Sequence, residues 1–163
     1  MLYKKGSYTE HFTSEKRKIN VFAGIGFYGK TDLFCFNGSF TVEIFKQIIE
    51  SLYRDSNLFK EKKKLQIVWD NSMIHHAKIT QEILRKKHLK SLFLPAYSPD
   101  LNPIENVWAV MKQDIYKNKF KSVEELIEKL EEVWDSIDPK KFIKNFSQRI
   151  ETVQEQNGGI TRY

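Results

Sequence analysis

The stretch LQIVWDNSMIHHAKITQEILRKKHLKSLFLP, residues 65–95, decides the fold, because it holds two short apolar runs on either side of a basic segment. LQIVWD (65–70) and LKSLFLP (89–95) have the length and apolar content of buried strands, and Pro95 ends the second. Residues 78–88 between them are predicted to form a short basic helix. One crossover helix makes the two strands neighbours in a sheet, which indicates an α/β protein.

The segments before this unit have the patterns of two strands and a helix, and those after it have the patterns of helices. No repeat, low-complexity tract or linker divides the chain, so residues 1–163 are expected to form a single domain. Ser122 followed by Glu125 makes a capping box. The expected elements are strands at 19–29 and 31–39, and helices at 40–53 capped by Thr41, at 103–117 with Pro103 in the first turn, from Ser122 to Ile137, and from Pro139 to about Val153.

GIGFYGKT, residues 24–31, matches the P-loop pattern and also the glycine pattern of dinucleotide-binding turns. Both patterns need a helix directly after the motif, because the helix start supplies amide groups for the phosphates. DLFCF follows the motif instead and is typical of a strand. Gly29 and Lys30 are therefore expected at a hairpin turn, with Phe27 and Tyr28 in the strand that leads into it, and no nucleotide is expected.

Charge and cysteine content narrow the class of protein. The net charge of +6 and the pI near 9.2 indicate either a polyanionic partner such as nucleic acid or simply a basic surface. The single cysteine, Cys35, excludes an internal disulfide and is expected to be an inert core residue in a reducing compartment. No signal peptide or membrane span is predicted, which favours a cytoplasmic protein without membrane partners.

Two carboxylates are candidates for a metal site. Asp70 ends the first strand of the decisive stretch, and Glu105 lies in the first turn of a helix after a proline-rich loop. Because parallel strands end at the same edge of a sheet, the two acids can converge. Converging carboxylates suit Mg²⁺ or Mn²⁺, and two such ions about 4 Å apart can drive an in-line phosphoryl transfer. A strand-end cap at Asp70 and a favourable helix-start charge at Glu105 explain the same residues without a site.

The motifs around these acids resemble those of a known family. VWDNSMIHHAK (68–78) and LFLPAYSPDLNPIENVWAVMK (92–112) closely resemble the DDE domain of mariner-type transposases, nearest to the bacterial insertion-sequence branch. Asp70 and Glu105 have the family spacing of 34 intervening residues. INVFAGIGFYGKTDLFCFNGSFTVEIFKQIIESL (19–52) matches the first hairpin and helix of the family. The resemblance implies a ribonuclease-H-like fold, a mixed sheet with helices on both faces.

The resemblance also implies roles for individual residues. Asp70 and Glu105 correspond to the second and third catalytic acids, and both would be metal ligands for Mg²⁺ or Mn²⁺. Further positions match residues that flank or shape this site: Asn71 and His75 beside the second acid, and Pro99, Asn102 and Trp108 around the third. His75 and His76 point in different directions on any regular element and do not form a metal pair by themselves. Lys112, one turn beyond Trp108, is a candidate DNA contact, although a solvated lysine is the simpler explanation.

The sequence departs from the family in one respect. The first catalytic Asp of the family lies on a strand ahead of the hairpin, and Glu10, Glu15 and Asp32 occupy the wrong places to replace it. The chain is therefore expected to be an N-terminally incomplete DDE domain that lacks the first strand and has little cleavage activity alone. An exposed edge at Ile19, Val21, Ala23 and Ile25 would favour dimerisation.

Three functions are compatible with these observations. The first is DNA transposition by cleavage and strand transfer at transposon ends, in association with the nucleoid. The second is a non-catalytic DNA-binding or assembly fragment that pairs with itself or with a full-length transposase. The third, a nucleotide hydrolase, would require ATP binding that is lost on Lys30→Ala. The basic segments KEKKK (60–64) and RKKHLK (85–90), the latter with Arg85, Lys86 and Lys87, are candidate DNA-backbone contacts or solvated faces.

Overall fold

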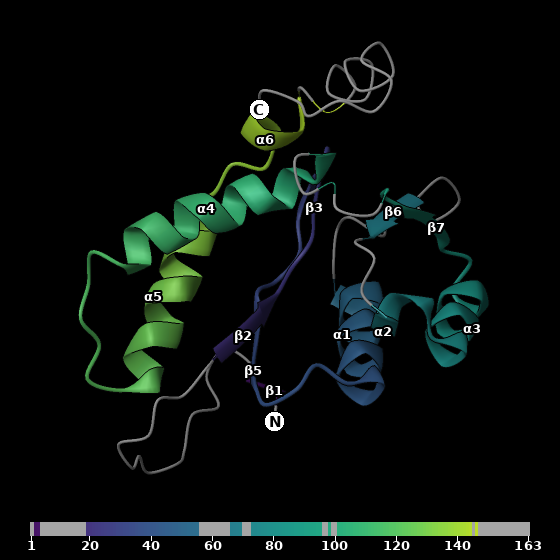
Figure 1. Cartoon of the computed structure of the whole chain (residues 1–163), viewed down its shortest axis with the longest axis horizontal. Helices are drawn as coiled ribbons and strands as arrows, with labels where there is room; N and C mark the ends of the chain where they lie inside the picture. The colour runs from purple at the N-terminus through teal and green to yellow at the C-terminus, as the bar shows by residue number, and fades with distance from the viewer. Residues whose placement is uncertain are drawn as a thin grey trace.

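The computed structural model describes residues 2–3, 19–55, 66–69, 73–95, 98, 101–144 and 146 (Figure 1). Strands come before the first helix, a strand–helix–strand unit follows, and helices make up the C-terminal part of the described chain, in the order that the apolar patterns predicted. The strands are β1 (Leu2–Tyr3), β2 (Ile19–Phe22), β3 (Ile25–Gly26), β4 (Gly29–Lys30), β5 (Phe34–Asn37), β6 (Gln66–Trp69) and β7 (Lys90–Phe93). The helices are α1 (Val42–Asp55), α2 (Met73–His76), α3 (Lys78–Lys86), α4 (Pro103–Ile115), α5 (Val123–Ser136) and α6 (Lys140–Ile143).

The strands form three small groups. β5 lies between β1 and β2 and is antiparallel to both, with Val21 opposite Cys35. β3 and β4 make a short antiparallel hairpin. β6 and β7 are parallel, with Val68 beside Leu92, so the predicted strand–helix–strand unit is confirmed. The result is a mixed arrangement in which both parallel and antiparallel pairs occur.

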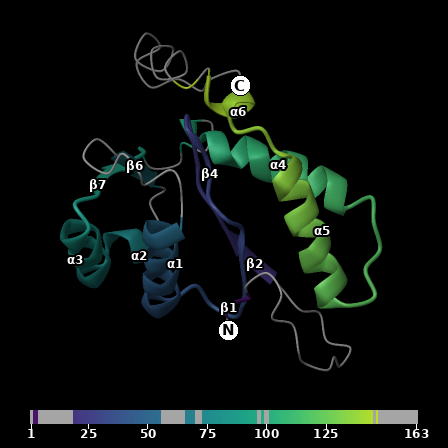
Figure 2. The ribbon, with the colours of Figure 1, turned by 180° about the vertical axis from the view of Figure 1, so that it is seen from behind.

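Helices cover the strands from two sides, as the ribbon shows from the front and from behind (Figures 1 and 2). A first cluster joins β2, β5 and β6 to α1 and α3 through buried side chains such as Phe34, Phe45 and Leu84. A second cluster joins the segments flanking β3 and β4 to α4 and α5 through Ala23, Val107 and Trp134. The expected mixed α/β fold with helices on both faces is therefore confirmed.

The helix starts follow the capping signals in the sequence. The Thr41 hydroxyl accepts a hydrogen bond from the Ile44 amide at 3.3 Å, and the Ser122 hydroxyl accepts one from the Glu125 amide at 3.2 Å. The Glu125 carboxylate accepts from the amide of Lys121 at 2.7 Å, one residue before the cap. These local bonds satisfy amides that would otherwise lack partners at the helix starts.

The turn of the first hairpin differs from the prediction by two residues. Phe27 and Tyr28 form the turn, whereas Gly29 and Lys30 begin the returning strand. Gly29 has a φ of 146°, a backbone conformation that glycine adopts without strain, and this allows the chain to reverse two residues earlier than the aromatic pattern indicated. The strand expected after Thr31 is present as β5, so no helix follows the glycine motif.

The two strands of the decisive stretch are less buried than predicted. Ile67 and Trp69 face the first cluster, but Val68 and Leu92 on the opposite face are 38% and 48% exposed. An apolar run of this length predicts burial on both faces, and within the described residues only one face is covered. The expected edge is also shorter than predicted, because β2 ends at Phe22 and Ala23 is buried in the second cluster.

Candidate active site

Glu105 lies in the first turn of α4. Asn102 is the residue before the helix and Pro103 occupies the first helical position, where a missing amide hydrogen costs nothing. The Glu105 amide bonds to the Asn102 carbonyl at 3.0 Å, and the Glu105 side chain is exposed. In the described part of the chain its carboxylate has no hydrogen bond or ion pair, so its oxygens are available to a cation or a polar ligand.

Trp108 fixes the orientation of this helix start. Its ring stacks on that of Trp134 in α5, with centroids 5.9 Å apart and an interplanar angle of 25°. Trp134 is buried, and Val107 beside Trp108 is completely buried in the same cluster. Because α4 is held against α5 one turn after Glu105, the packing of two helices positions the backbone that carries Glu105. The family resemblance alone predicted a shaping role for Trp108, since its partner lies far along the chain.

Asp70, Asn71 and Pro99 lie outside the described residues. The strand that leads to Asp70 is described, and the Leu94 amide bonds to the Trp69 carbonyl at 3.1 Å, so β6 and β7 end side by side. The convergence of Asp70 with Glu105 remains a prediction.

The two histidines after this strand diverge as predicted. His75 is buried, and its ring centroid lies 4.5 Å from that of Trp69 and 5.6 Å from that of Phe45. His76 is exposed and stacks on Phe93 at the end of β7, with centroids 4.1 Å apart. His75 therefore belongs to the aromatic packing beneath the strand ends, whereas His76 lies on the surface. Nothing in the sequence pattern indicated the His76–Phe93 pair.

The candidate DNA-contacting residues differ in how exposed they are. Arg85 and Lys86 are exposed at the end of α3, while the Lys87 ammonium lies over the Tyr53 ring at 4.3 Å and packs against α1. Lys112 is exposed on α4, seven residues after Glu105 and hence on the same side of that helix. Among the described residues of the segment 78–90, Glu82 is the one acid among five Lys and Arg side chains.

The described residues contain no group of three or more His, Cys, Asp or Glu side chains that could hold a metal ion. Glu105 offers exposed carboxylate oxygens, which are donors that Mg²⁺ and Mn²⁺ prefer. The donor type fits these ions, and the second expected donor, Asp70, follows β6 directly in the sequence.

The described helices include none that is long and apolar enough to cross a membrane.

The described residues define an α/β protein with an exposed carboxylate at a helix start, and comparison with known proteins gives the family. The model for the DDE superfamily endonuclease family matches residues 2–127, so the chain belongs to this family. The resemblance inferred from the sequence is thereby confirmed.

Relatives with curated sequences include transposases and an insertion-element protein. The chain is 32% identical over 105 residues to the Tc3 transposase of Caenorhabditis elegans, covering 61% of this chain and 32% of the relative. It is 26% identical over 93 residues to the 39 kDa protein of insertion element IS630 from Shigella sonnei, covering 56% and 27%. The chain spans about a third of the length of the curated relatives it matches.

The fold is that of the Mos1 transposase catalytic domain. A structure of that domain with raltegravir and Mg superposes with a TM-score of 0.79 at 19% identity, covering 93% of this chain and 81% of the neighbour. A Mos1 mariner paired-end complex with Mn gives the same TM-score at 18% identity, covering 98% and 51%. These likenesses confirm the expected ribonuclease-H-like architecture.

Proposed function

We propose that this chain is part of a DNA transposase that cleaves DNA at transposon ends and joins those ends to new sites. The observation that carries the proposal is membership of the DDE superfamily endonuclease family over residues 2–127. The sequence supplies two acids at the family spacing, and Glu105 occupies an exposed helix start. A protein with this function would act on DNA at the nucleoid, in the cytoplasm.

Asp70 and Glu105 are the proposed ligands of Mg²⁺ or Mn²⁺. When bound, such ions activate a water or a 3′-hydroxyl and stabilise the charge on the phosphate. Trp108 and Asn102 would act by orienting the helix that carries Glu105, and Asn71, His75 and Pro99 by shaping the ends of β6 and β7. These roles follow from the family motif and from the packing of α4 on α5.

The proposed DNA path runs over α3 and α4. Arg85, Lys86 and Lys112 are exposed, and cations of this kind bind phosphates with little regard to base sequence. Lys87 would contribute less, because its ammonium already lies over Tyr53.

We expect this chain alone to cleave DNA poorly, because two carboxylates make an incomplete clamp for two metal ions. A non-catalytic role remains the alternative, in which the chain pairs with a full-length transposase or a second copy. β2 would be the contact in that case: in the described residues it pairs with β5 alone, so its other edge is available.

Binding of Mn²⁺ tests the assignment of the acids without requiring activity. Free Mn²⁺ measured by electron paramagnetic resonance should fall when the chain is added, and Asp70→Ala or Glu105→Ala should abolish this effect. Glu43→Ala is the matched control, since Glu43 is also an exposed acid in the first turn of a helix. Equal Mn²⁺ binding by Glu105→Ala and by the unchanged chain would contradict the assignment.

Cleavage of supercoiled plasmid in Mn²⁺ then separates the two functions. No cleavage by a folded chain that still binds DNA is the expected outcome. Cleavage that both Asp70→Ala and Glu105→Ala abolish would mean that the two acids suffice or that a partner completes the site.

Charge reversal tests the DNA path. Arg85→Glu with Lys86→Glu should weaken duplex binding and flatten its dependence on salt, because fewer phosphate contacts release fewer counterions. Lys119→Glu with Lys121→Glu, which changes two exposed lysines between α4 and α5, is the control. Equal affinity and equal salt slope for the two double variants would refute this path.

A further inference from the structure

The GIGFYGKT hairpin has no part in the proposed chemistry, yet it is held more firmly than a surface turn requires. The Lys30 ammonium donates to the carbonyls of Trp134, Asp135 and Ile137 at the end of α5, the last two at 2.8 Å. It also lies 5.5 Å from the centre of the Trp134 ring. These contacts place a cation where the helix dipole is negative, beside carbonyls at the end of α5, of which that of Trp134 also accepts the Ile137 amide at 3.0 Å.

A second set of bonds closes the base of the hairpin. The Thr31 amide bonds to the Gly24 carbonyl at 2.9 Å, and the Gly24 amide bonds to the Thr31 hydroxyl at 2.8 Å. The Trp134 indole donates to the Thr31 carbonyl at 2.9 Å in a buried position. Ile25 packs against the second cluster. The hairpin is therefore a rigid projection fixed to α5.

The tip of this projection consists of two aromatic side chains in solvent. Phe27 is 60% exposed and Tyr28 is 77% exposed. Exposure of adjacent large aromatic rings on a rigid support is costly in water and indicates a contact surface. The tip lies near the start of α4, the helix turn that carries Glu105, and Ile25 and Ile104 pack against the same cluster (Figure 1).

Basic side chains lie next to the tip. α6 packs against β3 and carries Lys140 and Lys141, with Lys144 directly after it, and all three are exposed. None of them forms an ion pair within the described residues. Burial lowers the pKa of the Lys30 ammonium, and the negative charges of Asp135 and Asp138 oppose this shift in part. Lys30 thus offsets these two acids, and the three lysines of α6 remain available to phosphates.

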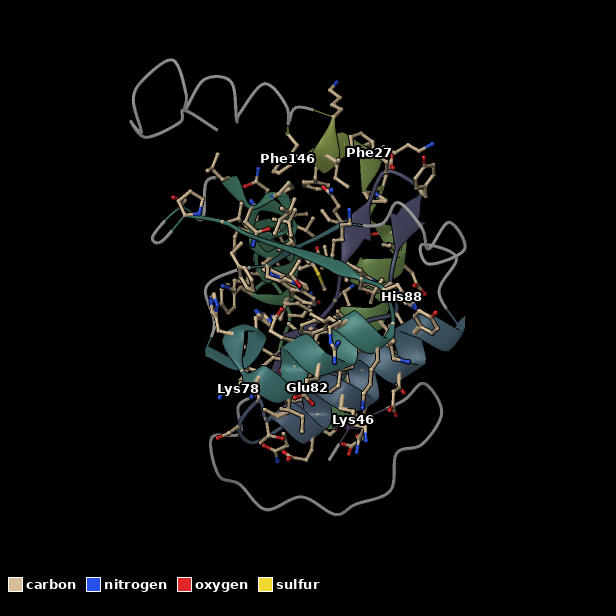
Figure 3. All side chains as sticks on the ribbon, turned by 90° about the vertical axis from the view of Figure 1, so that its right-hand side faces the viewer. Phe27, Lys46, Lys78, Glu82, His88 and Phe146 are labelled. Atoms are coloured by element: carbon tan, nitrogen blue, oxygen red, sulfur yellow. The ribbon has the colours of Figure 1, made fainter. Side chains whose placement is uncertain are left out.

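The hairpin tip lies away from the surface of α1 and α3. Figure 3 places Phe27 at one end of the molecule, while Lys46 of α1 and Lys78 and Glu82 of α3 lie toward the opposite end. The tip and the first turns of α3 are therefore separate surfaces.

We propose that Phe27 and Tyr28 form a stacking platform for unpaired DNA bases, with the phosphates of the same strand on the lysines of α6. Aromatic rings stack on any base, and neighbouring cations follow the backbone, which together make a site for single-stranded DNA. The proposal rests on the proposed action on DNA and adds a second contact surface near the Glu105 turn.

Fluorescence anisotropy with two labelled probes, a short oligothymidine and a fully paired duplex, tests the platform. Phe27→Ala with Tyr28→Ala should weaken binding of the oligothymidine about ten-fold and leave duplex binding within about two-fold. Phe27→Leu with Tyr28→Leu retains apolar surface without aromatic rings and should weaken oligothymidine binding to a similar degree. Tyr116→Ala is the matched control, since Tyr116 is 81% exposed at the other end of α4.

The remaining outcomes overturn the proposal in distinguishable ways. Equal effects on both probes, or none, would remove the platform, and sensitivity of duplex binding to Arg85→Glu with Lys86→Glu would still support the proposed function. Full oligothymidine binding by the Leu variant would show that the aromatic rings are not needed. Loss of self-association in the Ala variant without loss of DNA binding would make the tip a protein contact. Absence of DNA binding by the unchanged chain would refute both proposals.

Discussion

Two sides of the molecule differ in how well their buried polar groups are hydrogen-bonded. One is the hairpin side, residues 23–33 with α4, α5 and α6, and the other is the β6–β7 side. On the hairpin side, the Trp134 indole and the Lys30 ammonium both donate to carbonyls, and the side chains between them are buried. On the β6–β7 side, the buried Trp69 indole nitrogen has no partner among the described residues, and Val68 and Leu92 are partly exposed. Among the described residues, the buried side-chain donors of the first side have partners and its exposed apolar groups are those of the hairpin tip and the helix surfaces, whereas the second side leaves a buried indole donor without a partner and one strand face exposed.

The largest expected effect compares the two buried tryptophans. Trp134→Phe removes the donor to the Thr31 carbonyl and should lower the free energy of unfolding by about 2–4 kcal/mol, from an unpaired buried carbonyl and lost volume. Trp69→Phe removes a donor that has no partner among the described residues. It should lower the free energy of unfolding by at least about 1 kcal/mol less than Trp134→Phe does. Urea unfolding of both variants measures the difference. Equal losses would mean that Trp69 is as well satisfied as Trp134.

The next effect concerns the anchor of the hairpin. Lys30→Met keeps the length of the side chain but loses its hydrogen bonds to three carbonyls, and should lower the free energy of unfolding by about 2 kcal/mol. Lys46→Met is the control, because Lys46 is exposed and makes a 4.0 Å pair with Glu50 of the kind that contributes little. If the two variants proved equally stable in urea, Lys30 would not be an anchor.

A third effect appears only at high pH. Burial raises the pKa of the Cys35 thiol to about 12 from an ordinary value of 9.0. Above pH 9 the unfolded thiol ionises while the folded one stays protonated, so the free energy of unfolding falls as pH rises, by about 1.4 kcal/mol at pH 10 from this group. Cys35→Ala should lose this part of the slope between pH 8 and pH 10. Identical slopes for the two proteins would contradict the prediction.

The smallest effect concerns the open face of β6. Val68→Thr keeps the shape of the side chain and should change the free energy of unfolding by less than about 0.5 kcal/mol, because Val68 is already in contact with water. Val107→Thr, at a fully buried position of α4, should cost about 1–3 kcal/mol. A loss above about 1 kcal/mol for Val68→Thr would mean that the β6–β7 face is covered in solution.

Local patterns predicted most of the elements. The caps at Thr41 and Ser122 and the first turn at Pro103 each depend on a few neighbouring residues, and all three are present. The position of Glu105 at the start of a helix follows from the same signals. The parallel pairing of β6 with β7 follows from the short crossover between them.

Features that depend on distant contacts were not predictable in this way. Aromatic residues favour strands, so the pattern placed Phe27 and Tyr28 in a strand, whereas the structure puts them at the turn. The bonds from Lys30 to the end of α5 join residues more than 100 positions apart, and no periodicity indicates them. The exposure of Leu92 has the same origin, because an apolar run does not reveal which elements will cover it.

The burial of Cys35 has a practical consequence for anyone who studies this chain. It is the one cysteine in the sequence, it is 1% exposed, and it lies on the central strand β5. Alkylating reagents attack the thiolate, and a pKa of about 12 leaves about one thiol in ten thousand ionised at pH 8. The rate of labelling therefore reports how often the sheet around β5 opens. The unmodified sequence thus already contains a single-site probe of local unfolding.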